Sequence, residues 1–236
     1  MNTDTVLSLS DVEFGWEKAS SLLSIGSFNI QPGESVFLQG PSGSGKSTLL
    51  GLIGGVVRPR SGEILIRGES IASASSAKRD RIRVDNLGII FQQFNLLPYL
   101  SILANITLPC RFSKQRRETS RQTFSSPSEE ARHLVETLGL PQDILRSPVA
   151  KLSVGQQQRV AVARALIGGP SLIIADEPTS ALDSENRDRF IELLNTQRQS
   201  FNSSLLFVSH DRALAKHFDR VIDLKTLNQA RSEGAQ

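Results

Sequence analysis

The stretch GPSGSGKST, residues 40–48, decides the fold of this chain. It fits the pattern G-x-x-x-x-G-K-[ST], in which a glycine-rich turn opens a helix. The preceding segment, ESVFLQ at 34–39, predicts a short buried strand, and STLLGLI at 47–53 has the apolar spacing of a helix. A strand, a glycine turn and the start of a helix, in that order, are what a phosphate-binding loop requires.

Each residue type in this loop suits the binding of a nucleoside triphosphate. Glycine adopts backbone conformations that other residues avoid, so successive N–H groups can point at phosphate oxygens, as does the positive end of the helix dipole. We expect Lys46 to reach the β and γ phosphates and the Ser47 hydroxyl to ligate Mg²⁺. The predicted contacts are Gly40, Pro41, Ser42, Gly43, Ser44, Gly45, Lys46, Ser47 and Thr48. A turn that merely caps a helix is the alternative, and the flanking strand and helix disfavour it.

The composition is that of a globular protein. The chain has 236 residues, of which 39% are hydrophobic and 22% charged, so we expect one core with an inserted subdomain. A net charge of +3 does not by itself indicate nucleic acid binding. The single cysteine, Cys110, excludes an internal disulfide and a multi-cysteine zinc cluster, and fits a reducing compartment. Neither a signal peptide nor a run of about 18 apolar residues is visible. We therefore expect a cytoplasmic protein whose membrane role is peripheral.

The N-terminal part reads as strands. Residues 6–14 alternate partly between apolar and polar, and Trp16 closes this segment. Trp16 has two interpretations, packing at a sheet edge or stacking on an adenine ring. Residues 28–30, the turn at 31–33 and the strand into the phosphate loop predict a hairpin-like approach.

The middle of the chain predicts a helical insertion, at about 92–151. Residues 98–109 have helical spacing between two prolines, and helical spacing returns at 129–140. Between them, RFSKQRRETSRQTFSSPS at 111–128 is basic and poor in aliphatic residues. It is interpreted either as a solvated loop or as a contact with anionic lipid headgroups or a partner.

Strands and helices alternate in the C-terminal part. Residues 152–167 predict an amphipathic helix with a cap-like Ser153, and 184–197 predict another. Apolar strands are expected at 172–175 and 204–208. This order predicts an α/β fold with a mostly parallel sheet.

A further buried strand is predicted at 87–91, LGIIF. Four predicted strands end in groups suited to phosphate chemistry, which are the glycine loop, Gln92, the pair Asp176-Glu177 and His210. Ligand sites in parallel sheets collect at the carboxyl ends of the strands. A carboxylate directly after an apolar strand is placed to hold Mg²⁺, and the next carboxylate can polarise an attacking water. We therefore assign the metal to Asp176 and the water to Glu177.

Five motifs together resemble the ATP-binding-cassette (ABC) ATPases. They are the phosphate loop, Gln92, LSVGQQQR at 152–159, LIIADEPTSALD at 172–183 and His210, and they occur in the family's order over about residues 6–224. The segment 91–109, FQQFNLLPYLSILANITLP, resembles the MacB/LolD group of macrolide-export and lipoprotein-release ATPases.

The resemblance implies a P-loop NTPase fold. Its parts would be a mostly parallel central sheet, an antiparallel β subdomain and an inserted α-helical subdomain. The nucleotide-binding core would then comprise residues 1–91 and 152–236, and the insertion about 92–151, within one ABC ATPase domain of 1–236.

The resemblance also implies roles for single residues. Trp16 matches an aromatic residue that stacks on adenine. Gln92 matches a residue that senses Mg²⁺ and the γ-phosphate, and His210 matches a histidine that contacts the γ-phosphate. With Lys46 and Glu177, these two complete the expected catalytic set. The expected metal ligands are Ser47, Gln92 and Asp176.

Further matches imply a dimer. Ser153, Gly155 and Gln156 match the signature that contacts ATP held by the opposite subunit, and Asp183 matches a loop that communicates across the dimer. Val154 departs from the family, which usually has glycine there, and it is interpreted as a tolerated variant because its neighbours are intact.

The expected partners are a second, head-to-tail copy and a separate transmembrane subunit, with ATP and Mg²⁺ as ligands and the cytoplasmic side of the membrane as the location. No nucleic acid is expected. The function implied is an ATPase that powers export, lipoprotein release or mechanical signalling. The alternatives are a non-transporting ATPase that signals through a membrane partner, or one associated with DNA or translation.

Overall fold

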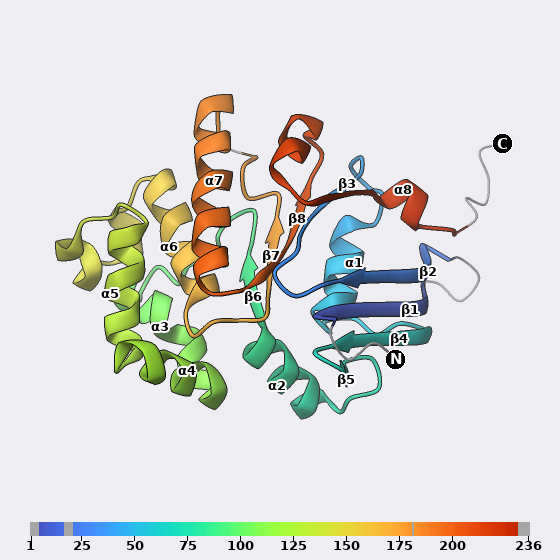
Figure 1. The fold of residues 1–236 in the computed structure, drawn as a ribbon, viewed down its shortest axis with the longest axis horizontal. Helices are drawn as coiled ribbons and strands as arrows, with labels where there is room; N and C mark the ends of the chain where they lie inside the picture. Colours follow the sequence, from blue (N-terminus) through green and yellow to red (C-terminus); the bar gives the residue numbers. More distant parts are fainter. Residues whose placement is uncertain (1–4, 17–20, 181, 231–236) are drawn as a thin grey trace. The chain divides into compact units, whose positions relative to one another are not determined.

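The computed structural model describes residues 5–16, 21–180 and 182–230 (Figure 1). Ala181, in the motif at 172–183, lies outside the described residues. The chain divides into two compact units, Met1–Asn86 with Ser204–Gln236, and Leu87–Ser203. Each unit is described by itself.

The first unit contains an antiparallel sheet with the strand order β2-β1-β4-β5. The strands are β1 (Leu7–Phe14), β2 (Leu23–Ile30), β4 (Ser61–Ile66) and β5 (Glu69–Ser70). On β1, Leu9 pairs with Phe28 of β2 and with Ile64 of β4, and all three side chains are buried. Buried and exposed positions alternate along β1 and β2, as expected of a sheet with one solvated face.

The first unit also contains three parallel strands. They are β3 (Ser35–Gln39), β8 (Ser204–Ser209) and β9 (Arg220–Asp223), and β3 pairs with both of the others. The helical segments of the unit are α1 (Lys46–Ile53), α2 (Ser76–Asn86), η3 (Arg212–His217) and α8 (Leu224–Leu227). The rings of Phe37 and Phe207 stack between β3 and β8 with centroids 6.1 Å apart. This packing fixes the strand that leads into the phosphate loop.

The predicted hairpin before the phosphate loop is wrong. The strand β2 pairs with β1, whereas β3 pairs with β8 and β9 in the parallel arrangement. The physical reason is the burial pattern, since β2 alternates but the first four residues of β3 are all buried. A strand that is apolar on both faces belongs inside a parallel sheet.

The second unit combines a parallel strand pair with helices. The strands β6 (Leu87–Ile90) and β7 (Leu172–Asp176) pair in parallel, with Leu87 opposite Leu172 and Ile90 opposite Ala175. The helical segments are α3 (Ile102–Phe112), α4 (Lys114–Phe124), α5 (Pro127–Thr137), η1 (Gln142–Arg146), η2 (Val149–Lys151), α6 (Val154–Leu166) and α7 (Ser184–Ser200). Helices α3, α4 and α5 pack against one another (Figure 1). Cys110 is buried among them, and burial raises the pKa of its thiol to about 11, as befits a structural cysteine.

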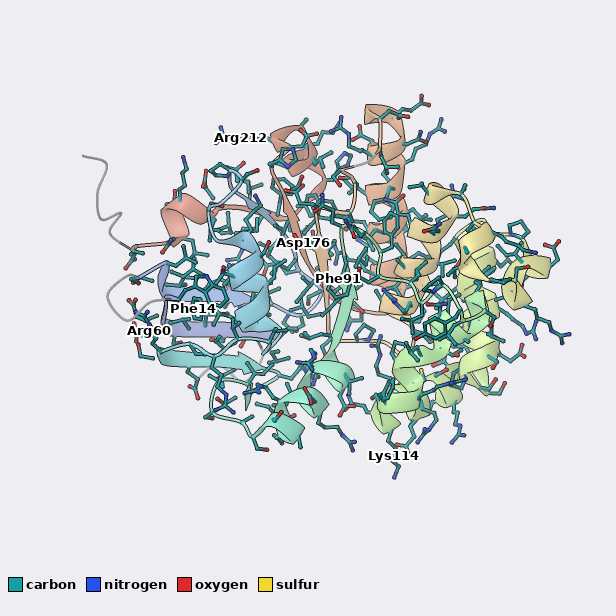
Figure 2. All side chains as sticks on the ribbon, turned by 180° about the vertical axis from the view of Figure 1, so that it is seen from behind. Phe14, Arg60, Phe91, Lys114, Asp176 and Arg212 are labelled. Carbon is teal, nitrogen blue, oxygen red and sulfur yellow. The ribbon has the colours of Figure 1, made fainter. Side chains whose placement is uncertain are left out.

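The interpretation of residues 111–128 as a solvated loop is wrong, because most of this segment is helical. Ser113 caps α4 by accepting a hydrogen bond from the Arg116 N–H, and Ser126 caps α5 by accepting one from the Glu129 N–H. Serines that suggested a loop therefore begin two helices. Lys114 projects outward from α4 (Figure 2). The alternative of a lipid or partner contact stays a prediction.

Arg116 anchors this basic segment to the core of the second unit. It is 2% exposed, and its guanidinium donates hydrogen bonds to the carbonyl oxygens of Ile167 (2.8 Å), Ala165 (2.7 Å) and Leu87 (3.3 Å). These carbonyls lie at the end of α6 and the start of β6. A single buried side chain thus ties α4 to two other elements of the unit.

The predicted fold class is confirmed, with parallel strands, an antiparallel sheet and several helices. The predicted insertion, at about 92–151, falls entirely within the second unit, which also holds β6, β7, α6 and α7. Its boundaries stay a prediction. Across the part of the chain that the structure describes, none of the helices has the length and apolar character needed to cross a membrane.

Replacing Arg116 with methionine should destabilise the protein by roughly 3 kcal/mol or more, because buried acceptors left without donors cost about 1–3 kcal/mol each. Urea unfolding followed by circular dichroism measures this change. Arg121→Met, at an exposed position of the same helix, is the control and should change the free energy of unfolding by less than about 0.5 kcal/mol. Equal stability of the two variants would contradict the core role of Arg116.

Candidate functional site

The phosphate loop connects β3 to α1 in the conformation that an anion requires. Gly43 has φ 78° and Gly45 has φ 97°, values that favour glycine. Gly45 is the N-cap of α1, no side chain caps this helix, and its first turn carries no acidic residue. The amide groups at the start of α1 are thus available to an anion.

The lysine of the loop already lies within the loop. Lys46 Nζ donates hydrogen bonds to the carbonyl oxygens of Gly40 (2.7 Å) and Pro41 (3.1 Å). Its positive charge is therefore held over the turn that would receive phosphate groups. Ser47 is exposed at the first turn of α1, where its hydroxyl is accessible to a ligand.

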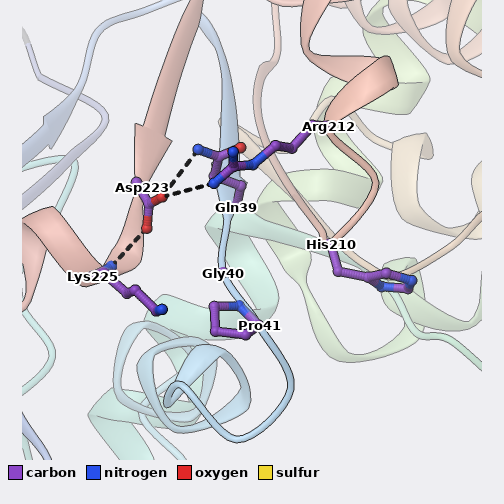
Figure 3. Close-up of a pocket in the computed structure, with 7 residues that line it drawn as sticks. All are labelled: Gln39, Gly40, Pro41, His210, Arg212, Asp223 and Lys225. Carbon is purple, nitrogen blue, oxygen red and sulfur yellow. Dashed lines mark hydrogen bonds and ion pairs between the residues drawn. The ribbon is translucent and has the colours of Figure 1, made fainter.

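His210 follows the last residue of β8 and lines a cavity of about 230 Å³ together with Gly40 and Pro41 of the phosphate loop (Figure 3). The structure thus brings this predicted residue to the phosphate loop within the first unit. Its ring points away from the polar cluster on the other side of the cavity (Figure 3).

That polar cluster is centred on Asp223, which sequence reasoning missed. The Asp223 carboxylate accepts hydrogen bonds from Gln39 Nε2 (3.1 Å) and from the backbone N–H of Lys225 (2.9 Å), and Arg212 lies 3.6 Å away. Gln39 and Asp223 are paired residues at the ends of β3 and β9. The sequence did contain a signal for this cluster, because Gln39 and Asp223 are polar residues at the ends of two largely apolar strands. The cluster ties the residue before the phosphate loop to the segment after His210.

In the second unit, the two predicted carboxylates end β7. Asp176 is the last residue of the strand, and Glu177 follows it with φ 46°. A side chain in this left-handed region is strained, and such strain is concentrated at functional sites. Gln92 Nε2 lies 3.4 Å from Ser180 Oγ, so the segment after β6 meets the segment after Glu177.

Helix α6 holds both of these segments, a role that the sequence did not reveal. The buried Gln158 donates from Nε2 to the Pro178 carbonyl at 2.9 Å. Arg164 donates to the carbonyls of Phe94 (2.5 Å) and Asn95 (2.7 Å), which have φ values of 59° and 47°. Burial lowers the pKa of Arg164. The strained turns next to Glu177 and Gln92 are therefore fixed by one helix.

The start of α6 forms a capping box. Ser153 Oγ accepts a hydrogen bond from the Gln156 N–H (3.3 Å), and Gln156 Oε1 accepts one from the Ser153 N–H (3.0 Å). The serine O–H and the glutamine NH₂ remain as donors for a ligand. Gly155 has open space where a side chain would stand, and Val154 is 55% exposed. The departure at Val154 therefore causes no clash within this chain.

Asp183 begins α7 as its N-cap. Hydrogen bonds from the backbone N–H (2.9 Å) and the side-chain amide (2.8 Å) of Asn186 hold the pKa of the Asp183 carboxyl below its ordinary value. This carboxylate is exposed and charged at neutral pH, so it is available to a second molecule.

Trp16 is 70% exposed, and its ring meets that of Phe14 edge-on with centroids 5.0 Å apart. Edge packing therefore accounts for one side of the ring and leaves the rest accessible. Stacking on adenine stays a prediction.

The expected magnesium ligands supply a hydroxyl, an amide and a carboxylate oxygen, from Ser47, Gln92 and Asp176. Mg²⁺ prefers oxygen donors, and the three side chains are exposed or half-buried, so the residues fit this ion chemically. Ser47 belongs to the first unit and the other two to the second.

Comparison with known proteins decides the family. The model of the ABC transporter family matches residues 23–180, more than half of the chain. The chain belongs to the ABC transporter ATP-binding family. An uncharacterised ABC transporter ATP-binding protein of Mycobacterium tuberculosis, MT1014, is 38% identical over 228 residues, covering 95% of this chain and 89% of the relative. Nucleotide binding is a property of this family.

Two further relatives support the subfamily resemblance. The macrolide export ATP-binding/permease protein MacB of Sodalis glossinidius is 39% identical over 83% of this chain, but the match covers only 29% of MacB. The uncharacterised ABC transporter ATP-binding protein MJ0796 of Methanocaldococcus jannaschii is 39% identical, with 87% of this chain and 86% of the relative covered. The resemblance to the MacB/LolD group is confirmed at this level.

Solved structures show the same fold. The dimeric post-hydrolysis structure of the MJ0796 cassette bound to ADP and Pi has a TM-score of 0.76 and 34% identity, and covers 92% of this chain and 93% of that one. The structure of cbiO1 from Clostridium perfringens, part of the ABC transporter complex cbiONQ, has a TM-score of 0.79 and 25% identity, covering 93% of this chain and 84% of that one.

Gly45→Ala should destabilise the phosphate loop and weaken ADP binding at least about tenfold, a loss of about 1.4 kcal/mol. Alanine is strained at φ 97°, and its Cβ would lie 3.0 Å from Leu23 Cδ2. Isothermal titration calorimetry measures the affinity. Gly155→Ala is the matched control, because its Cβ meets no atom within 4 Å. The Gly155→Ala monomer should bind ADP with unchanged affinity. Unchanged ADP affinity in Gly45→Ala would refute the assignment of the phosphate loop.

Proposed function

We propose that two copies of this chain close head-to-tail around two ATP molecules, hydrolyse them with Mg²⁺ and pass the movement to a separate transmembrane protein. The observation that carries this proposal is the presence in one chain of two helix starts with accessible donors, the uncapped start of α1 and the start of α6 with its capping box. The dimeric structure of the MJ0796 cassette with ADP and Pi supports it.

The proposed chemistry is in-line attack of water on the γ-phosphate. Glu177 polarises the water, and it directly follows the last residue of β7, with a backbone φ of 46°. Lys46 and His210 stabilise the negative charge that develops on the transferred phosphoryl group. Mg²⁺, held by Ser47, Gln92 and Asp176, would neutralise phosphate charge when bound.

The second copy completes each site. Ser153 and Gln156 fix the start of α6 in place with their mutual hydrogen bonds, and each keeps a donor for the γ-phosphate bound by the opposing copy. Asp183, exposed at the start of α7, is the proposed contact across the dimer. Closure then depends on ATP, and hydrolysis removes the contact that holds the copies together.

The membrane partner is proposed to dock beside Gln92, along residues 94–108. Apolar side chains are exposed in and next to this region, with Tyr99 at 78% and Phe91 at 38%. Exposed aromatic residues are typical of protein interfaces. The macrolide export protein MacB, by its name, joins an ATP-binding part to a permease, which supports a transmembrane partner and a position at the membrane for this chain.

Glu177→Gln should retain ATP binding and lower the hydrolysis rate at least about 100-fold, because a general base contributes 10²–10⁴-fold. The variant should elute as a dimer in ATP and as a monomer in ADP, as measured by light scattering on a sizing column. Glu185→Gln is the control, since the exposed Glu185 carboxylate pairs with Arg189 at the surface of α7. Normal turnover by Glu177→Gln would refute the catalytic assignment.

The same trapped variant tests the membrane partner when purified from membranes in ATP. Recovery of a membrane protein with a large periplasmic domain supports the MacB/LolD type. A many-spanning permease places the chain with another transporter group. Recovery of DNA or ribosomal proteins would overturn transport.

A further inference from the structure

Helix α4 carries a row of positive charges that the proposed ATPase cycle does not use. Five of the chain's 27 Lys and Arg residues lie at 111–124, together with one of its 24 acidic residues. Lys114, Arg117 and Arg121 follow one another at intervals of three and four residues, so they share one face of the helix. Arg116 lies on the buried face, and Lys114 projects outward (Figure 2). The helix is thus anchored on one side and charged on another.

The charges of this row are weakly neutralised within the chain. Lys114 Nζ lies 3.7 Å from a Glu118 carboxylate oxygen, but both side chains are more than half exposed, and such a pair contributes little. Arg111 and Arg121 are exposed and form no ion pair with any residue that the structure describes. The row therefore presents an excess of positive charge to an outside partner.

The end of α3 adds an apolar side chain to this row. Arg117 Nη1 donates a hydrogen bond to the Cys110 carbonyl oxygen at 3.5 Å, so the row reaches the last turn of α3. There Phe112 is 68% exposed, and Arg111 precedes it. The α4 patch consists of Arg111, Phe112, Lys114, Arg117 and Arg121. Cations around an exposed ring suit the headgroup region of a bilayer, where the cations meet phosphate and the ring enters the acyl boundary.

The position of the α4 patch on α3 and α4 favours a membrane over a nucleic acid. The segment proposed to contact the transmembrane partner, 94–108, runs into α3, and α3 ends at Phe112. About one helical turn, roughly 6 Å, separates that segment from Phe112. A surface so close to a transmembrane protein faces the adjoining bilayer. This step rests on the proposed function, since the position of the partner is taken from it.

We propose that the α4 patch binds the surface of an anionic phospholipid membrane, as a second membrane contact beside the protein partner. The guanidinium and ammonium groups bind lipid phosphates, and the Phe112 ring enters the boundary between headgroups and acyl chains. Each Lys or Arg near an anionic membrane strengthens binding about fivefold. Four such residues give an association that is reversible and sensitive to salt.

The test measures co-sedimentation of the full chain with sucrose-loaded vesicles, in ADP and without the membrane partner. Vesicles of phosphatidylcholine alone are compared with vesicles that contain an equal amount of phosphatidylglycerol. At low salt the chain should bind the anionic vesicles at least about tenfold more tightly. Salt at about 1 M should remove most of this difference, because the Debye length falls to about 3 Å. Equal binding to both kinds of vesicle would overturn the proposal.

Matched double variants locate the contact. Lys114→Gln combined with Arg121→Gln should weaken binding to the anionic vesicles at least about tenfold, since two charges of the α4 patch are lost. Arg132→Gln combined with Arg146→Gln removes the same charge from exposed positions outside the α4 patch, and should change binding by less than about twofold. Equal losses in the two double variants would show that net charge alone acts, and would refute the α4 patch.

The ring of Phe112 separates a bilayer from other anionic partners. Phe112→Ser should weaken binding to the anionic vesicles at least about threefold, because less apolar surface enters the acyl boundary. Unchanged binding by this variant would contradict the proposal. A single-stranded oligonucleotide that binds more tightly than the anionic vesicles, and fails to bind the Lys114 and Arg121 double variant, would assign the α4 patch to nucleic acid instead.

Failure of vesicle binding is distinguishable from failure of the proposed ATPase cycle, because the assay needs neither hydrolysis nor the membrane partner. Lys46→Ala should lose hydrolysis and bind anionic vesicles as the wild type does. The Lys114 and Arg121 double variant should hydrolyse ATP at the wild-type rate and lose vesicle binding. Loss of vesicle binding in Lys46→Ala would contradict a contact made by the α4 patch.

Discussion

Backbone amides at the start of a helix need acceptors, and this requirement shapes both units of the chain. In the first unit, glycine stands where a capping side chain would stand, so α1 offers its amides to an outside anion. In the second unit, a capping box of Ser153 and Gln156 fixes the start of α6 while leaving side-chain donors accessible. One chain thus carries two helix starts with accessible donors, of different construction, and the proposed dimer brings one of each to every ATP.

Polar side chains of α6 hold this helix, whose start carries the capping box, against two other segments of the second unit. Gln158 and Arg164 donate to carbonyls in the two segments that carry the predicted catalytic residues, and both segments contain left-handed backbone. Strained turns persist only where their surroundings over-determine them. Arg116 adds a further constraint by binding carbonyls at the end of the same helix. A movement of α6 would therefore displace the strained turns, and in the proposed cycle this transmits ATP-driven closure to the region that contacts the membrane partner.

The sequence predicted what depends on local pattern and missed what depends on distant contacts. The phosphate loop, the cap at Ser153 and the carboxylates at the end of β7 were predictable, because each needs only neighbouring residues. The helix at Lys114–Phe124 was not, since its apolar content is low and its stability depends on the buried Arg116 and remote carbonyls. The cluster at Asp223 and the role of Arg164 likewise join residues far apart in the chain.

The central claim is that each ATP site needs the phosphate loop of one copy and the α6 start of the other. Subunit complementation tests it most directly. Lys46→Ala and Ser153→Arg should each be inactive alone, whereas an equimolar mixture should recover about a quarter of the wild-type hydrolysis rate. Random pairing makes half of the dimers mixed, and each mixed dimer has one intact site out of two. A quarter of all sites are then intact, and the rate follows this fraction when the two sites act independently. If Ser153→Arg alone hydrolysed ATP at the full rate, and the rate per copy did not depend on protein concentration, one copy would suffice. That result would contradict a site shared between two copies.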